Sequence, residues 1–275
     1  MNGDSPKGFV LTCLAITISL LTFKRPYLTF HAGPYQKYFP QNRAKILTPV
    51  YKFIFLASRR IICNNDAVKE KIVGYGIKPE KIIPIQAFSV QYLKYQPVSF
   101  NGHLRAAFEN SFPVIATYVF NRPEFFISRM LKAVREVVKT YPKLKLIFLG
   151  YDEDYEEIRQ EINALELTSN VVFAGDQDHD SFLTILNKSH IYLRTPVKDG
   201  VSSSVLEALS LKTVVVASEN YRRPPGVVTY DNSSIEDFVA VLIKVSGDIK
   251  NYRNRIKAPI IRDTVEDEML LLTED

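Results

Sequence analysis

The chain has 275 residues, of which 46% are hydrophobic and 24% charged, and it contains two cysteines. These fractions are ordinary for a globular protein of one large or two modest domains, and they exclude a disordered, collagen-like or disulfide-scaffold protein. The net charge of +5 is compatible with a solvated surface, an anionic ligand or an anionic membrane surface, whereas no interleaving of aromatic and basic residues points to nucleic acid.

An apolar run at residues 8–23 lies between Lys7 and Lys24. A membrane span needs about 20 apolar residues, and this shorter run contains four Thr or Ser residues. It also lacks the small-residue cleavage site of a signal peptide. We therefore expect a buried helix that leads into the strand after Pro26. The alternative is a small membrane-anchored interaction protein that uses this run.

The first half of the sequence predicts a short α/β segment. Strands are expected at residues 27–30, 60–63 and 82–85, and helices at 46–57 and 66–75. Residues 86–112 are rich in polar residues and include Pro97 and Gly102, so we interpret them as a connection between domains. Because no strand is expected before the helix at 8–23, the first domain is predicted to be incomplete.

The second half repeats this pattern more fully. Strands are expected at residues 113–117, 145–149, 170–174, 191–193 and 213–217, alternating with helices at 128–140, 155–165, 181–189, 203–211 and 234–245. The strands are continuous apolar runs, which is typical of a parallel sheet buried on both faces in an α/β doubly wound domain. Ligands bind beyond the carboxyl ends of such strands, so candidate binding residues lie at 118–124, 150–154, 175–179, 194–204 and 218–226.

One of these segments carries the residues that point to chemistry. It reads Asp199-Gly200-Val201-Ser202-Ser203-Ser204-Val205-Leu206-Glu207. Backbone N–H groups, serine hydroxyls and the positive end of the helix dipole make such a helix start an anion site suited to phosphate. Glu207 lies about one turn into the helix, where its carboxylate can reach a hydroxyl-rich ligand. A capped helix with a serine-rich start fits the spacing equally well.

The spacing of Asp199 and Glu207, with seven residues between them, resembles the Glu-x7-Glu motif of family 4 glycosyltransferases (glycosyl transferases group 1), with Asp as the first residue. Further segments resemble strands of this family in the same order: residues 26–33 (PYLTFHAG), 60–82, 141–150 (YPKLKLIFLG) and 170–175 (NVVFAG). Residues 222–228 resemble a subgroup with an Arg-Pro-x-Gly-Val tail. Taken together, the resemblance covers almost the whole chain.

The resemblance implies a type B glycosyltransferase fold with two facing Rossmann-like domains. The domains would be a partial N-terminal, acceptor-side domain at 1–100, a nucleotide-sugar-binding domain at 101–250, and a helical tail at 251–275 that packs back on the first domain. It implies retaining transfer of a sugar from a nucleotide-diphosphate sugar to a lipid-linked, polysaccharide or other glycan acceptor. No metal and no other cofactor is expected, in line with Cys13 and Cys63, which lack metal-ligand spacing and are interpreted as reduced core residues. The expected location is cytoplasmic, peripheral at the inner membrane face.

Residue roles follow from the same resemblance. Glu207 would hold the nucleotide ribose and Asp199 the transferred sugar. The diphosphate would bind to the segment from Gly200 through Val201, Ser202 and Ser203 to Ser204. His31 would face the sugar and phosphate across the cleft.

The sequence also departs from the family pattern. A basic pair normally follows the first strand of the second domain, and here Arg122 is the substitute phosphate ligand, with Arg129 a weaker candidate and a surface Arg the alternative. The first domain lacks the opening strands and their glycine-rich loop. The alternative function is therefore a catalytically impaired, truncated remnant that binds nucleotide only. A dinucleotide dehydrogenase is disfavoured because no Gly-x-Gly-x-x-Gly follows a strand.

Overall fold

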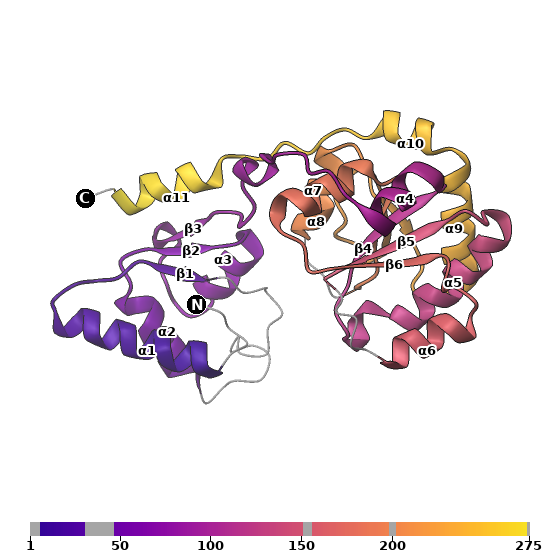
Figure 1. Ribbon diagram of the computed structural model, residues 1–275. Helices are drawn as coiled ribbons and strands as arrows, with labels where there is room; N and C mark the ends of the chain where they lie inside the picture. The colour runs from indigo at the N-terminus through magenta and orange to yellow at the C-terminus, as the bar shows by residue number, and fades with distance from the viewer. Residues whose placement is uncertain (1–5, 31–46, 151–155, 198–201, 274–275) are drawn as a thin grey trace. The chain divides into compact units, whose positions relative to one another are not determined.

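The structure is a computed structural model that describes residues 6–30, 47–150, 156–197 and 202–273 (Figure 1). It divides into two compact units: unit 1 is Met1–Tyr92 with Ile261–Asp275, and unit 2 is Leu93–Ile260. Four residues with predicted roles, His31, Asp199, Gly200 and Val201, lie outside the described residues.

Unit 1 is built around a parallel sheet with the strand order β1-β2-β3 among the described residues. Thr29 is in register with Ile62, and Ile62 with Ile83. The regular elements of this unit are α1 (Pro6–Leu21), β1 (Leu28–Phe30), α2 (Thr48–Ala57), β2 (Ile61–Cys63), α3 (Asp66–Val73), β3 (Ile82–Pro84) and α11 (Thr264–Thr273), with 3-10 turns at Pro79–Lys81 and Val90–Leu93.

Aromatic packing holds the helices of unit 1 to its sheet. The ring of Phe55 on α2 lies 5.8 Å from that of Phe30 on β1 and 5.2 Å from that of Tyr75. The neighbouring strand residue, Thr29, donates from Oγ1 to Glu268 of α11 at 3.2 Å. Because successive side chains of a strand point to opposite faces, α2 and α11 cover opposite faces of the sheet.

Unit 2 contains a parallel sheet with the strand order β6-β5-β4-β7-β8-β9. Helices cover both faces: α5 packs against α9 on one face and α7 against α8 on the other (Figure 1). The elements are α4 (Gly102–Asn110), β4 (Val114–Tyr118), α5 (Ile127–Thr140), β5 (Lys145–Leu149), α6 (Glu156–Ala164), β6 (Val171–Gly175), α7 (His179–Lys188), β7 (Ile191–Arg194), α8 (Ser203–Ser210), β8 (Val214–Ser218), β9 (Val228–Tyr230), α9 (Ile235–Gly247) and α10 (Ile249–Arg255), with a 3-10 turn at Pro123–Phe125. The predicted α/β fold with parallel sheets is confirmed.

Three elements of unit 2 escape the sequence patterns. The stretch interpreted as a connection between domains contains α4, a helix that was not predicted, of which only Ala107 is buried among the described side chains. The edge strand β9 is three residues long, and α10 has no buried residue. The strand β9 and the seven-residue α10 are too short to show the apolar periodicity from which elements are predicted.

The prediction of a buried first helix is wrong. Among the described side chains of α1, Ile16 is buried at 2% exposure, while Leu11 is 65%, Ile18 61% and Leu21 75% exposed. The inner side packs on α2, where the rings of Phe9 and Tyr51 are 5.2 Å apart. Unit 1 covers one side of a helix whose sequence is apolar all round. Within the described ranges, no helix is long and apolar enough to cross a bilayer.

We predict that Gly150→Ala destabilises unit 2 more than Gly175→Ala does. Both glycines have a left-handed φ, 70° and 69°, so alanine at either position should lower the free energy of unfolding by about 1 kcal/mol. A Cβ at Gly150 would lie 2.6 Å from the ring of Tyr118, whereas no described atom lies within 4 Å at Gly175. We expect an additional loss of about 1–3 kcal/mol at Gly150. Urea denaturation followed by circular dichroism measures both, and equal losses would contradict the prediction.

Candidate functional site

The strand order of unit 2 defines where a ligand would bind. The chain runs outward from β4 through β5 to β6, then returns to place β7 on the other side of β4. Doubly wound sheets bind ligands at the carboxyl ends of the two strands that flank such a reversal. A cavity of about 670 Å³ lies at this point, and we call it the switch-point cavity. Its lining residues are Phe120, Arg122, Pro123, Glu124, Phe125, Phe126, Arg194, Pro196 and Val197.

Hydrogen bonds join the two segments that form this cavity. The buried hydroxyl of Thr195 donates to the carbonyl of Phe125 at 2.6 Å. Arg194, the last residue of β7, donates from Nη1 to the carbonyl of Tyr118 at 3.4 Å. Its guanidinium carbon lies 5.4 Å from the ring centroid of Phe125. The segments after β4 and β7 are therefore held against each other, with a cation at the junction.

Arg223 fixes the next segment in the same way. Its Nε donates to the carbonyl of Ser218 at 2.9 Å, and its Nη2 donates to the carbonyl of Pro196 at 2.7 Å and to Ser218 Oγ at 3.0 Å. Ser218 Oγ also donates to the carbonyl of Pro196 at 3.0 Å. This side chain ties the end of β8 to the end of β7 and adds positive charge beside the cavity.

The predicted serine-rich segment forms the start of α8. Ser202 is the N-cap, in an extended conformation, and Val205 and Leu206 donate from their backbone N–H groups to its carbonyl. The N–H groups of Ser203 and Ser204 precede this intrahelical ladder and belong to the positive end of the helix. Tyr192 of β7 donates from its hydroxyl to Ser204 Oγ at 2.7 Å, and Ser204 Oγ lies 2.8 Å from Ser202 Oγ. The helix start is thereby attached to the sheet.

Glu207 is the most unusual residue of α8. It is 8% exposed, and burial raises the pKa of its carboxyl group to about 7. No described residue donates a hydrogen bond to this carboxyl group or forms an ion pair with it. An unpartnered acid at a buried position opposes folding, and strongly shifted carboxyl groups are concentrated at functional sites. Its role as a group that accepts hydrogen bonds from ligand hydroxyls stays a prediction.

The structure places the two predicted arginines differently. Arg122 lines the switch-point cavity, with its guanidinium carbon 5.3 Å from the ring of Phe120 and its Nη1 3.9 Å from Glu124 Oε1. Its role as a phosphate ligand stays a prediction. Arg129 instead donates to the backbone carbonyl of Asn232, on the side of α9. It does not line the switch-point cavity.

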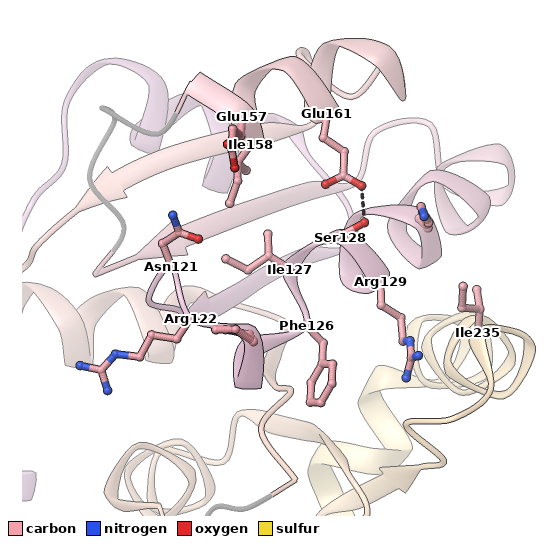
Figure 2. Close-up of a pocket in the computed structure, with 12 residues that line it drawn as sticks. Asn121, Arg122, Phe126, Ile127, Ser128, Arg129, Glu157, Ile158, Glu161 and Ile235 are labelled. Atoms are coloured by element: carbon pink, nitrogen blue, oxygen red, sulfur yellow. Dashed lines mark hydrogen bonds between the residues drawn. The ribbon is translucent and has the colours of Figure 1, made fainter.

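A second cavity of about 580 Å³ lies beside the start of α5 (Figure 2). Its lining combines Arg129 and Lys132 with Glu157 and Glu161, and Ser128 Oγ donates to Glu161 across it. Arg122 also lines this second cavity, so each cavity has one more cation than carboxylate. Charge therefore does not separate the two cavities, and we favour the switch-point cavity for an anion because it lies where the strand order reverses.

Sequence reasoning did not assign Arg194 and Arg223 to the site. Both lie in segments that it singled out because they follow strand ends, at 194–204 and 218–226. Their contacts are to backbone carbonyls of residues that are distant in the sequence. No spacing motif encodes such contacts, so position after a strand was the only signal available.

Comparison with known families identifies the class of protein to which this site belongs. The profile described as "Glycosyl transferases group 1" matches residues 108–260, which is more than half of the chain. The chain therefore belongs to the group 1 glycosyltransferase family, and its parallel-sheet fold is the type B glycosyltransferase fold. The matched residues lie within unit 2 and include the described residues of the switch-point cavity and α8.

Individual relatives agree with this family. The chain is 25% identical over 227 residues to an uncharacterised glycosyltransferase of Methanocaldococcus jannaschii, covering 76% of this chain and 55% of the relative. It is 27% identical over 195 residues to the chloroplastic digalactosyldiacylglycerol synthase 2 of Arabidopsis thaliana, covering 69% of this chain and 36% of that one. The crystal structure of Anabaena HepE in complex with UDP has a TM-score of 0.67 at 15% identity, over 96% of this chain and 75% of that one. The chain spans about half the length, or less, of the curated relatives it matches.

We predict that Glu207→Gln changes how stability depends on pH. The pKa of Glu207 is about 7 in the folded chain and about 4.3 in an unfolded chain. Below about pH 4.3 the carboxyl group is protonated in both states, and its contribution to stability is fully present. That contribution is lost as the pH rises through about 7. Glutamine stays neutral, so between about pH 5 and about pH 8 the wild-type chain should lose roughly 1–3 kcal/mol relative to the variant. Urea midpoints at both pH values measure this, with the exposed Glu136→Gln as control, and equal shifts for the two variants would refute it.

Proposed function

We propose that this chain binds a nucleotide-diphosphate sugar at the switch-point cavity and the start of α8 and transfers its sugar to a hydroxyl acceptor. The observation that carries this proposal is the buried Glu207, which has no partner among the described residues and lies one turn inside a serine-rich helix start. A hydroxyl-rich group and an anionic group bound side by side are what this arrangement would accept. A nucleoside diphosphate has both, in its ribose and its two phosphates.

The diphosphate would be held by the N-terminus of α8. The N–H groups of Ser203 and Ser204 and the helix dipole favour negative charge there, and Arg122 and Arg194 supply cations from the cavity wall. During transfer, the bond between the anomeric carbon and the phosphate oxygen breaks, the acceptor oxygen bonds to that carbon, and the departing diphosphate gains negative charge and takes up the proton of the acceptor hydroxyl. Fixed dipoles and guanidinium groups aimed at that charge lower the barrier. We propose that this arrangement takes the place of a metal ion.

Glu207 would accept hydrogen bonds from the ribose hydroxyls, which requires its ionised form. A carboxyl group with a pKa near 7 is only partly ionised at neutral pH. Hydrogen bonding to the charged form lowers a carboxyl pKa, so bound ribose would favour ionisation. Ligand binding and deprotonation of Glu207 are therefore expected to be coupled.

The finer assignments rest on the resemblance to family 4 enzymes. They are a retaining mechanism, contact of Asp199 with the transferred sugar, and His31 facing the sugar and phosphate. The name of the Arabidopsis relative, a digalactosyldiacylglycerol synthase, supports a lipid-linked acceptor over other glycans. The UDP bound in the Anabaena structure supports UDP as the nucleotide. The two free cysteines support a cytoplasmic setting.

A second candidate is nucleotide binding without transfer. It is favoured by the difference in size between the two sheets, which have three strands in unit 1 and six in unit 2 among the described residues. Apart from His31, the groups assigned to the ribose and the diphosphate belong to unit 2, so nucleotide binding would depend mainly on unit 2. Incubation of the full chain with a radiolabelled nucleotide sugar and a lipid extract separates the candidates, because label in a lipid product requires transfer.

Calorimetric titration of the full chain with UDP, GDP and ADP, without metal, tests the donor site. We expect one of these nucleotides to bind, with an affinity that rises from about pH 6 to about pH 8 as Glu207 ionises. Glu207→Ala should weaken that binding by about ten- to a hundredfold, because it removes hydrogen bonds to a charged group. Glu207→Gln should lose the pH dependence.

Glu161→Ala, in the second cavity, is the matched control and should leave nucleotide affinity unchanged. Unchanged affinity in Glu207→Ala would show that the site is assigned wrongly. So would an equal loss in Glu161→Ala.

A further inference from the structure

The outward side of α1 is an apolar surface. Val10, Leu11, Leu14, Ile18 and Leu21 recur at the three- to four-residue spacing of one helix face, and each is between 54% and 75% exposed. The opposite side of the same helix, with Phe9 and Ile16, packs into unit 1. Large apolar patches of this kind are rare on soluble surfaces and mark binding to a partner or a membrane.

The neighbouring helix also exposes apolar side chains. Phe53 and Leu56 of α2 are 52% and 50% exposed, whereas Tyr51, Ile54 and Phe55 of the same helix face the core. Figure 1 shows α1 and α2 beside each other on the same side of the sheet, with α1 drawn in indigo. We call the outward residues of both helices, Val10, Leu11, Leu14, Ile18, Leu21, Phe53 and Leu56, the α1–α2 apolar face.

The sequence that carries this face is strongly basic. Residues 1–65 contain nine Lys or Arg and one acidic residue, Asp4, although the whole chain carries 35 basic and 30 acidic residues. Lys7, near the start of α1, and Lys24 and Arg25, just after its end, are exposed. A face that is apolar at its centre and basic at its edges complements a bilayer with anionic headgroups, to which both apolar burial and cation attraction contribute. An apolar protein partner would give no reason for this excess of cations.

The length of α1 decides between spanning and lying on a bilayer. Its 16 residues extend about 24 Å at about 1.5 Å per residue, less than the hydrocarbon core of about 30 Å. Its inner side is also occupied by contacts to α2. Cations at both ends suit a helix that lies in the plane of the headgroups, where both ends reach phosphate.

We propose that the α1–α2 apolar face docks unit 1 on the surface of an anionic lipid bilayer. The helix α1 lies in the interface, with Leu11, Leu14 and Ile18 entering the acyl boundary and Lys7, Lys24 and Arg25 contacting headgroup phosphates. This surface is separate from the nucleotide site of unit 2, and the proposal goes beyond the proposed transfer reaction without depending on it.

Flotation of the full chain with vesicles tests this docking. The wild-type chain should bind vesicles of phosphatidylcholine with phosphatidylglycerol and bind vesicles of phosphatidylcholine alone much more weakly. Binding should weaken when salt rises from about 0.1 M to about 1 M and the screening length falls from about 10 Å to about 3 Å. Leu14→Glu with Ile18→Glu should weaken binding more than about a hundredfold, because two apolar anchors are lost.

The matched control is Met269→Glu with Leu270→Glu on α11. These residues are 61% exposed, and the net charge changes by the same amount, so binding should fall far less. A second pair separates charge from packing. Lys24→Gln with Arg25→Gln should bind about tenfold more weakly, whereas Lys250→Gln with Lys257→Gln, exposed residues of unit 2, should keep binding.

Three results would overturn the proposal: no binding of the wild-type chain to anionic vesicles, equal losses in a test pair and its control pair, or a dimer in sedimentation velocity that Leu14→Glu with Ile18→Glu disperses. The last would make the face a contact between copies. Nucleotide affinity of the Leu14→Glu with Ile18→Glu variant, measured by calorimetry, should equal that of the wild-type chain. Failure of the docking proposal is thus distinguishable from failure of the donor-site proposal.

Discussion

The reversal of strand order at β4 is the constraint on which the site of unit 2 depends. Because β7 returns to lie beside β4, the segments that leave these two strands diverge and leave a cavity at their carboxyl ends. Thr195 and Arg223 then fix the geometry through hydrogen bonds to the carbonyls of Phe125 and Pro196. The start of α8 is attached to β7, the strand beside β4, through the bond between Tyr192 and Ser204. The positions of the cations and of the helix dipole follow from the topology of a single sheet.

Glu207 shows how this arrangement trades stability against binding. Its burial without a partner among the described residues raises its pKa to about 7 and disfavours the folded state wherever the group is ionised. An apolar residue there would pack in α8 without this disadvantage. A carboxyl group at such a position is explained by a ligand that supplies the missing hydrogen bonds, and the same residue is the one that the family resemblance singles out.

The sequence predicted those features that depend on local patterns. Strands such as β5 and β8 are continuous apolar runs, and the serines before Glu207 have the spacing of a helix start, so both were predictable. The roles of Arg194 and Arg223 were not, because each depends on backbone carbonyls that the topology brings near. The exposure of α1 was also missed. Periodicity cannot distinguish a helix buried on all sides from one that is apolar all round and covered on one side.

Hydrogen–deuterium exchange of the full chain, with and without the nucleotide that binds, tests the central claim most directly. The diphosphate is proposed to lie against the start of α8 and the base of the switch-point cavity. We therefore predict slower exchange on binding at residues 202–206 and 119–126, with unit 1 and α6 unchanged. Protection confined to the second cavity, around residues 157–161, would contradict the account.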